Sequence, residues 1–282
     1  MYQIMKIETL APKTKLIRIH SPEIAAVAKA GQFVILRVDE RGERIPLTLV
    51  DWDQEKGTIT LIFQEVGVST EKLGSMLANE ILYDVVGPLG NPSDIKFYGI
   101  VVVIGGGVGT APCLPISKAL KNAGNKVISI IGARNEKLLI LEREMNQICD
   151  EVFISTNDGS KGQKGFVTDV LTMLIKKGYS VDVVYAIGPP VMMRAVVQVT
   201  RKHKIKTIVS LNPIMVDGMG MCGACRVSIG GHSKFACVDG PEFDGHQVDF
   251  DELINRQRSF ISEEKLSLEH WKCAHEKTGG KQ

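Results

Sequence analysis

The sequence predicts three structural parts in one chain: an antiparallel β-barrel, a doubly wound α/β domain and a small cysteine-bearing module. Short alternating or apolar runs separated by turn residues fill residues 1–98, and strands alternate with helices in residues 99–212. Evenly spaced strands are typical of a barrel, whereas strand–helix alternation is typical of a parallel sheet. Three of the six cysteines fall within residues 213–250, and a polar tail covers residues 251–282.

The composition narrows the possible functions. The chain has 282 residues, of which 44% are hydrophobic and 23% charged, and its formal net charge is +2. A charge this close to zero predicts no nucleic-acid partner. The longest apolar run, Ile100–Ile104, is far shorter than the roughly 20 residues that a membrane helix needs, so we expect no membrane partner. Six cysteines, three of them clustered, favour a metal site in a reducing, cytoplasmic setting over a disulfide framework.

The barrel is predicted from strand-like segments in the first 98 residues. Residues 14–22, 31–38 and 58–66 are alternating or apolar, and turn residues such as Gly42 and Gly57 separate them. A short helix is expected over Ser69–Leu77. The run G-P-L-G-N-P at residues 87–92 predicts a loop, because glycine and proline disfavour the interior of an element.

The α/β domain is predicted from its alternation. The first strand is a continuous β-branched run, as expected of a strand that is buried on both faces. The expected strands are Ile100–Ile104, Lys126–Ile131, Glu151–Thr156, Asp182–Ile187 and Lys206–Ser210, with helices at Cys113–Ala123 and Leu138–Gln147. The tail after residue 250 is polar with a few apolar anchors, which predicts a helical segment that packs on a partner and frays at its end.

A glycine-rich turn joins the first of these strands to the first helix. Glycines allow the backbone to approach a pyrophosphate closely, and a helix that starts near Thr110 offers free N–H groups to an anion. The candidate dinucleotide contacts are Gly106, Gly107, Val108, Gly109 and Thr110. The alternative is a tight turn that binds nothing.

Two further segments follow predicted strands at the edge of the sheet where such folds bind ligands. Asp158 offers an acceptor to a ribose hydroxyl, which favours NAD over NADP, although an Asx turn before Gly159 explains the residue equally well. Gly188 would let a nicotinamide lie close to the backbone. Pro189 belongs to the same segment, which also fits a stiff turn.

The barrel carries weaker anion-binding signals. Arg44 is a fork-shaped donor suited to a phosphate or a flavin carbonyl, and Thr48 offers a hydroxyl on a strand. Gly67, followed by Ser69 and Thr70, opens the short helix and forms another candidate anion site. The competing interpretations are a solvated arginine and a plain helix cap.

The cysteine-bearing module predicts a metal or iron–sulfur site. Cys222 and Cys225 have C-x2-C spacing, and Cys237 follows after eleven residues. A closed site needs a further ligand. Asp217 precedes Cys222 by five residues, where a plant-type C-x4-C-x2-C run has its first cysteine, so we interpret Asp217 as an oxygen ligand in place of a thiolate.

Three alternatives to this ligand set remain open. The site could be a zinc knuckle with Asp217, Asp239 or His232 as its fourth ligand. The cysteines could instead be free structural thiols. Finally, Asp217 could be only a turn residue before Gly218.

Taken in order, these motifs resemble the ferredoxin–NADP reductase-like superfamily. R-I-P-L-T, G-V-S-T, G-G-G-V-G-T-A-P and A-I-G-P-P match its barrel and α/β motifs, and C-G-A-C…C-V-D-G-P resembles electron-transfer subunits related to that of type B dihydroorotate dehydrogenase. The resemblance covers about residues 1–250. It implies that NAD(H) contacts Gly107, Gly109, Asp158 and Gly188, and that a [2Fe–2S] cluster is held by Asp217, Cys222, Cys225 and Cys237. It also implies that FAD contacts Arg44, Pro46, Leu47, Thr48, Gly67, Ser69 and Thr70.

Asp217 is the departure from the dihydroorotate dehydrogenase pattern. An aspartate with three cysteines resembles the small subunit of NADH-dependent ferredoxin:NADP oxidoreductase. That resemblance implies electron transfer between NAD(H), FAD and the cluster, in a heterodimer with a larger flavin and iron–sulfur subunit that performs electron bifurcation with ferredoxin. No catalytic side chain is expected, because the cofactors carry the chemistry. The alternatives are a dihydroorotate dehydrogenase electron-transfer subunit and a non-enzymatic, zinc-bearing dinucleotide-binding protein.

Overall fold

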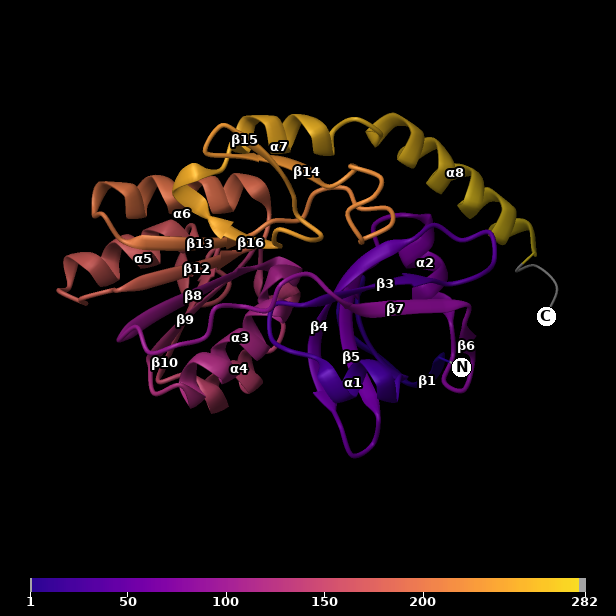
Figure 1. Cartoon of the computed structure of the whole chain (residues 1–282), viewed down its shortest axis with the longest axis horizontal. Helices are drawn as coiled ribbons and strands as arrows, with labels where there is room; N and C mark the ends of the chain where they lie inside the picture. Colours follow the sequence, from indigo (N-terminus) through magenta and orange to yellow (C-terminus); the bar gives the residue numbers. More distant parts are fainter. Residues whose placement is uncertain (1, 279–282) are drawn as a thin grey trace.

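The computed structural model describes residues 2–278, and for residues 275–278 the backbone only. The predicted fraying end of the tail, residues 279–282, lies outside the described residues. Figure 1 shows the barrel and the α/β domain side by side, with the cysteine-bearing segment and helices α7 (Phe250–Gln257) and α8 (Ile261–Thr278) along one side of both. The predicted fold class, a barrel followed by an α/β domain and a small C-terminal module, is confirmed.

The barrel is a nearly closed antiparallel sheet with strand order β6-β1-β2-β5-β4-β3-β7. Its interior is filled by inward-facing side chains such as Ile17, Leu36 and Leu61, all fully buried, because alternate residues of each strand face inward. The strands are β1 (Tyr2–Ala11), β2 (Thr14–His20), β3 (Phe33–Arg37), β4 (Ile45–Asp53), β5 (Thr58–Gln64), β6 (Ile81–Leu82) and β7 (Asp84–Leu89), with helices α1 (Pro22–Val27) and α2 (Val68–Ser75).

The predicted loop at residues 87–92 is wrong over its first half. Gly87, Pro88 and Leu89 lie in β7, which pairs with β3 through Ile35↔Val86 and Phe33↔Leu89. A proline cannot donate to a strand ladder, but β7 is the last strand of the sheet and its register with β3 is irregular, so Pro88 is tolerated there.

The α/β domain is a sheet with strand order β11-β10-β9-β8-β12-β13-β16, parallel except for β16. Both faces are covered, as predicted. Val101 and Val103 of β8 face helices α3 and α4, whereas Val102 and Ile104 face α5 and α6. The elements are β8 (Ile100–Gly106), η1 (Gly107–Gly109), α3 (Thr110–Asn122), β9 (Lys126–Ala133), η2 (Glu136–Leu138), α4 (Glu142–Ile148), β10 (Glu151–Thr156), β11 (Gln163–Lys164), α5 (Val167–Lys176), β12 (Val183–Ile187), α6 (Pro190–Lys202) and β13 (Lys206–Ser210).

The second predicted helix of this domain starts later than expected. The sequence predicts a helix from Leu138, but α4 begins at Glu142. Leu141 has a positive φ of 58°, a left-handed conformation that an α-helix cannot contain, so the chain turns there before the helix starts.

The C-terminal part returns to the sheet. After the cysteine segment, β16 pairs antiparallel with β13, and helix α7 packs beside α6. Helix α8 runs from α7 across to the barrel and contacts α2 (Figure 1). These elements are β14 (Arg226–Ile229), β15 (His232–Phe235), β16 (Glu242–Asp244), η3 (Gly245–Gln247), α7 (Phe250–Gln257) and α8 (Ile261–Thr278). Within the described residues, no helix has the length and apolar character to cross a membrane.

Candidate functional site

The glycines at the ends of β8 and β12 lie against each other. A Cβ atom on Gly109 would be 2.5 Å from the Ile187 carbonyl oxygen and 2.7 Å from Gly188 Cα, and one on Gly188 would be 3.2 Å from Gly106 Cα. A side chain at Gly109 or Gly188 would therefore separate the two turns. Gly107 differs, because its φ is +58° and a Cβ there would meet no atom within 4 Å. The turn is thus open to an approaching ligand at Gly107.

The glycine-rich turn also faces the barrel. Val108 and Ala111 pack with Val50 of β4 and Ile62 of β5 in one apolar cluster. Thr110, at the start of α3, is buried. The predicted dinucleotide turn and the barrel strands therefore meet at the boundary between the two domains.

The barrel candidates are distributed over β4 and the start of α2. Pro46, Leu47 and Thr48 lie on β4 opposite Ile35, Val34 and Phe33 of β3 and are partly exposed. These three candidates therefore lie on one strand pair, β3 and β4. Arg44, just before β4, is exposed.

At the start of α2, two candidate side chains already have partners. Thr70 Oγ1 accepts from the Gly67 N–H at 3.1 Å, so it caps the helix as the simpler interpretation supposed. The Ser69 hydroxyl donates to Glu43 at 3.0 Å. A Cβ on Gly67 would meet no atom within 4 Å, which leaves room for a ligand at the helix start.

The cysteine segment rests on the barrel. A Cβ on Gly218 would lie 2.7 Å from Ile35 and 2.9 Å from Leu89, so this turn fits tightly against β3 and β7. Cys225 and Cys237 are buried in the same apolar cluster as Phe33 and Ile35. Phe33 is the register partner of Thr48, and the cysteine segment is therefore one strand away from the flavin candidates on β4.

The Asp217 carboxylate organises the turn that precedes the first cysteines. It accepts hydrogen bonds from the N–H groups of Met219 (2.9 Å), Met221 (3.2 Å) and Cys222 (2.8 Å). The Met219 N–H makes the largest contribution to holding the pKa of Asp217 below its usual range. The carboxylate is thus charged and lies at the start of the cysteine segment. Asp217 holds the turn together, as one interpretation predicts, and its charge also suits the other interpretation, that of a metal ligand.

The three thiols of the segment are free of disulfides. The Sγ atoms of Cys225 and Cys237 are 3.1 Å apart, and burial, together with the Cys225 thiol, raises the pKa of Cys237 to about 12. Cys222 is exposed at the surface of the turn. Among the residues that the structure describes, no three Cys, His, Asp or Glu side chains are arranged to hold a metal ion.

The other side chains considered as a fourth ligand are placed differently. The Asp239 carboxylate accepts from the Phe235 N–H at 2.7 Å and is 3.4 Å from the Lys234 ammonium, so it stabilises its own turn. His232 is exposed at the start of β15.

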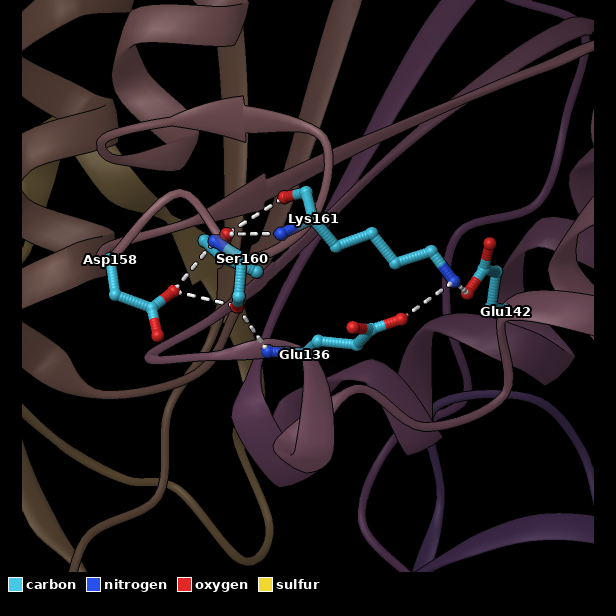
Figure 2. A network of polar contacts seen from close by, with 6 residues as sticks. Glu136, Glu142, Asp158, Ser160 and Lys161 are labelled. Atoms are coloured by element: carbon cyan, nitrogen blue, oxygen red, sulfur yellow. Dashed lines mark hydrogen bonds and ion pairs between the residues drawn. The ribbon is translucent and has the colours of Figure 1, made fainter.

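Asp158 lies on an exposed loop at the carboxyl end of β10, where its Oδ1 accepts from the Ser160 N–H (2.9 Å) and hydroxyl (2.7 Å) (Figure 2). The hydroxyl bond is the main reason that the pKa of Asp158 lies below its usual value. The sequence did not point to Ser160. The signal available for it is the D-G-S order, because a serine two residues after an aspartate can complete an Asx turn.

Two family models match this chain. The oxidoreductase NAD-binding domain matches residues 103–198, and the iron–sulfur cluster binding domain of dihydroorotate dehydrogenase B matches residues 212–249. The predicted iron–sulfur cluster and NAD(H) are thereby confirmed as cofactors.

Similar proteins cover most of the chain. It is 48% identical over 253 residues to the dihydroorotate dehydrogenase B (NAD(+)) electron transfer subunit homolog of Thermotoga maritima, covering 90% of this chain and 89% of that protein. It is 32% identical over 230 residues to the dihydroorotate dehydrogenase B electron transfer subunit of Clostridium perfringens, covering 81% and 90% respectively.

Solved structures agree with these relatives. The fold superposes with a TM-score of 0.91, at 44% identity, on a chain of an NADH-dependent reduced ferredoxin-NADP oxidoreductase studied for flavin-based electron bifurcation, covering 96% of this chain and 98% of that one. A ferredoxin NADP+ reductase from Neisseria gonorrhoeae with bound FAD and NADP shares the fold at 16% identity, with a TM-score of 0.56 over 71% of this chain and 89% of that one. The predicted fold is thereby confirmed.

Proposed function

Because this chain belongs to the family of dihydroorotate dehydrogenase B electron-transfer subunits and their homologues, we propose that it passes electrons between NAD(H), FAD and a [2Fe–2S] cluster and a larger partner subunit. We further propose that the pair is a heterodimeric, electron-bifurcating NADH-dependent ferredoxin:NADP oxidoreductase, whose larger subunit carries flavin and iron–sulfur centres and serves ferredoxin. Identity of 44% and a TM-score of 0.91 over nearly the whole chain support this assignment.

The cluster ligands that we propose form two pairs. A [2Fe–2S] cluster has two irons with two protein ligands each, so its ligands need not converge on a single point. Cys225 and Cys237, with Sγ atoms 3.1 Å apart, would serve one iron. Asp217 and Cys222 would serve the other, since the Cys222 N–H already donates to Asp217 and the Cys222 side chain also lowers the Asp217 pKa. Three thiols and one ionised carboxylate are a donor set that suits ferric iron.

The carrying observation is the position of the cysteine segment. The segment packs on β3. The strand next to β3 is β4, which carries Pro46, Leu47 and Thr48. A bound FAD would supply the link between the two-electron chemistry of NADH and the one-electron chemistry of the cluster. In this proposal the residues of β4 and α2 orient the flavin, and the turns at Gly107 and Gly188 orient the dinucleotide.

A larger partner is supported by the surface around the cysteine segment. Val216, Met219, Met221 and Val238, each within two residues of a proposed ligand, are exposed, and Met221 is 83% exposed. Exposed apolar side chains that gather in one place commonly mark interaction surfaces. Electrons would leave the chain across this surface. Cysteines that hold a cluster and form no disulfide are typical of a reducing compartment, which supports a cytoplasmic location.

An anaerobic absorbance spectrum, recorded with iron and sulfide analysis before and after NADH addition, tests the proposal. We expect flavin and iron–sulfur bands that both bleach with NADH, and two irons and two sulfides for each chain. Zinc without labile sulfide would instead support the non-enzymatic alternative. Bleaching by NADPH alone would refute the choice of NAD(H).

A second candidate, an electron-transfer subunit of dihydroorotate dehydrogenase itself, is favoured by the match of the iron–sulfur domain. The two candidates differ in the partner. Co-purification from the native source separates them: a partner that oxidises dihydroorotate supports the second candidate, whereas a partner that reduces NADP with ferredoxin supports the first.

A further inference from the structure

The loop after β10, residues 157–162 (here the β10 loop), carries two side chains with no assigned role, Ser160 and Lys161. Both belong to the polar network of Figure 2, which joins this loop to the segment after β9. The carboxyl ends of β9 and β10 lie next to each other in the parallel sheet, at the edge where α/β folds bind dinucleotides. Asp158, the residue predicted from the sequence to meet a ribose, lies at one end of this network beside Ser160.

Ser160 fixes the direction of the Asp158 carboxylate. The Ser160 hydroxyl donates to Asp158 Oδ1 at 2.7 Å and accepts from the Glu136 N–H at 2.8 Å. Because a hydroxyl has one proton, these two partners define its orientation. The Ser160 N–H also ends on Oδ1, at 2.9 Å, so Oδ2 takes part in neither bond with Ser160.

Lys161 is held on the opposite side of the loop. Its ammonium lies 2.7 Å from Glu142 Oε2 and 3.8 Å from Glu136 Oε1, and Figure 2 shows the side chain extending away from Asp158. The backbone of Lys161 is anchored on buried Thr156, whose hydroxyl accepts from the Lys161 N–H at 3.1 Å and donates to its carbonyl at 2.7 Å. The lysine is thus charged but already paired with two carboxylates.

We propose that Ser160 is a positioning residue for the dinucleotide ribose and that Glu142, by pairing with Lys161, is a selectivity residue that favours a free 2′-hydroxyl over a 2′-phosphate. The proposal rests on the proposed function and on the prediction from the sequence that Asp158 accepts a hydrogen bond from the ribose of NAD(H). Asp158 Oδ2 meets the hydroxyl in a fixed direction.

A 2′-phosphate would place negative charge beside the Asp158 carboxylate and would need a cation in return. Lys161 is the cation of the network, but its ammonium group is already paired with the Glu142 carboxylate, on the side of the loop away from Asp158. Two exposed basic residues flank the loop: Arg134, whose carbonyl accepts from the Asp158 N–H, and Lys164, whose side chain lies beside Gly159. The expected discrimination is therefore a ratio of affinities and not an absolute rejection.

Binding of two nucleotides to the purified, cofactor-loaded complex tests this proposal. Titration calorimetry gives the dissociation constants of 5′-AMP and adenosine 2′,5′-bisphosphate, and neither compound reacts with a flavin. Ser160→Ala should weaken 5′-AMP binding roughly tenfold, about the contribution of one charge-assisted hydrogen bond, and Ser160→Thr should restore it. Glu142→Gln should improve binding of the bisphosphate relative to 5′-AMP by about five- to tenfold.

Glu144→Gln is the matched control, because Glu144 is exposed on the same helix α4 and loses the same charge. If Glu142→Gln and Glu144→Gln change the ratio of the two dissociation constants equally, the effect comes from net charge alone, and the selectivity role of Glu142 is wrong. Unchanged 5′-AMP affinity in Ser160→Ala, when Asp158→Asn weakens it, would overturn the positioning role alone. If Asp158→Asn also leaves 5′-AMP affinity unchanged, the predicted ribose contact of Asp158 is itself wrong, whereas electron transfer from NADH to the flavin and cluster is tested separately by the absorbance spectrum.

Discussion

Ser93 and Glu242 meet where the three parts of the chain join: the Ser93 hydroxyl donates to Glu242 Oε1 at 2.6 Å. Ser93 lies in the connection from β7 to β8, and Glu242 begins β16, just after the cysteine segment. Gly31, at the entry to β3, completes the contact, since a Cβ there would be 3.1 Å from the same carboxylate oxygen. Burial raises the pKa of Glu242 to about 7, so the junction contains a carboxyl group that changes protonation near neutral pH.

This carboxyl makes the stability of the protein depend on pH. The folded chain keeps the Glu242 proton up to a pKa of about 7, whereas the unfolded chain releases it near the ordinary value of 4.5. The folded state binds more protons in this window, so the free energy of unfolding should fall as pH rises through it, by at most about 3 kcal/mol. Urea unfolding at a series of pH values measures the slope.

Glu242→Gln should flatten that slope, because glutamine stays neutral throughout. Glu264→Gln, at an exposed position of α8, is the matched control and should leave the slope as it is. If the free energy of unfolding of Glu242→Gln still falls with pH as in the wild type, groups other than Glu242 cause the pH dependence.

Substitutions of Asp217 can separate its two roles. Asparagine keeps one acceptor oxygen, which can serve either the Met219 N–H or the N–H groups of Met221 and Cys222, and it lacks the charge that suits ferric iron. We expect Asp217→Asn to retain the fold and lose much of its iron and labile sulfide, whereas Asp217→Cys should retain the cluster with a shifted reduction potential. Metal analysis and electron paramagnetic resonance of the reduced protein provide the comparison. Full cluster content with an unaltered spectrum in Asp217→Asn would leave Asp217 a turn residue only.

Gly109→Ala should destabilise the α/β domain by about 2 kcal/mol or more, because the added methyl would overlap backbone atoms. Its nearest neighbours would be the Ile187 carbonyl oxygen and Gly188 Cα, neither of which is the flexible end of a side chain. Thermal unfolding of the two proteins gives the difference. Wild-type stability in this variant would mean that the β8 and β12 turns are more loosely packed than the structure has them.

Gly67→Ala should differ from Gly109→Ala, because it should affect FAD binding and not stability. No atom lies within 4 Å of the added methyl, so the free energy of unfolding should change little in the cofactor-free protein. If the flavin pyrophosphate approaches the start of α2, the same methyl should lower FAD content several-fold. Flavin content measured after release by denaturation checks this, and normal flavin content in Gly67→Ala would move the FAD site away from Gly67.

The sequence was a reliable guide where one signal dominated. The β-branched run at Ile100–Ile104 predicts a strand that is packed on both faces, and β8 is such a strand. At residues 87–92, local composition and strand pairing disagree. Gly87 and Pro88 lie in a strand because β7 pairs with β3, although their composition favours a loop. This contact is long-range, so local composition could not predict it.

The use of the Asp217 oxygens could not be predicted for a related reason. Gly218 and Gly220 adopt positive φ values of 73° and 83°, and these two turns curl the chain so that several N–H groups point at one carboxylate. Glycine permits that conformation without requiring it. The pairing of Ser160 with Asp158 depends in the same way on the path of the loop, as does the meeting of Ser93 with Glu242.

The register between β13 and β16 has a consequence for how such a chain can be assembled. The chain leaves the sheet at Ser210 and returns at Glu242, its direct partner, and the Leu211 N–H closes the base on the Pro241 carbonyl at 2.9 Å. Topologically, the iron-binding segment is the loop of a hairpin, and loop closure depends only weakly on loop length. Because its two ends meet in one base, the segment can be gained or lost between β13 and β16 without a change in the strand order of the sheet.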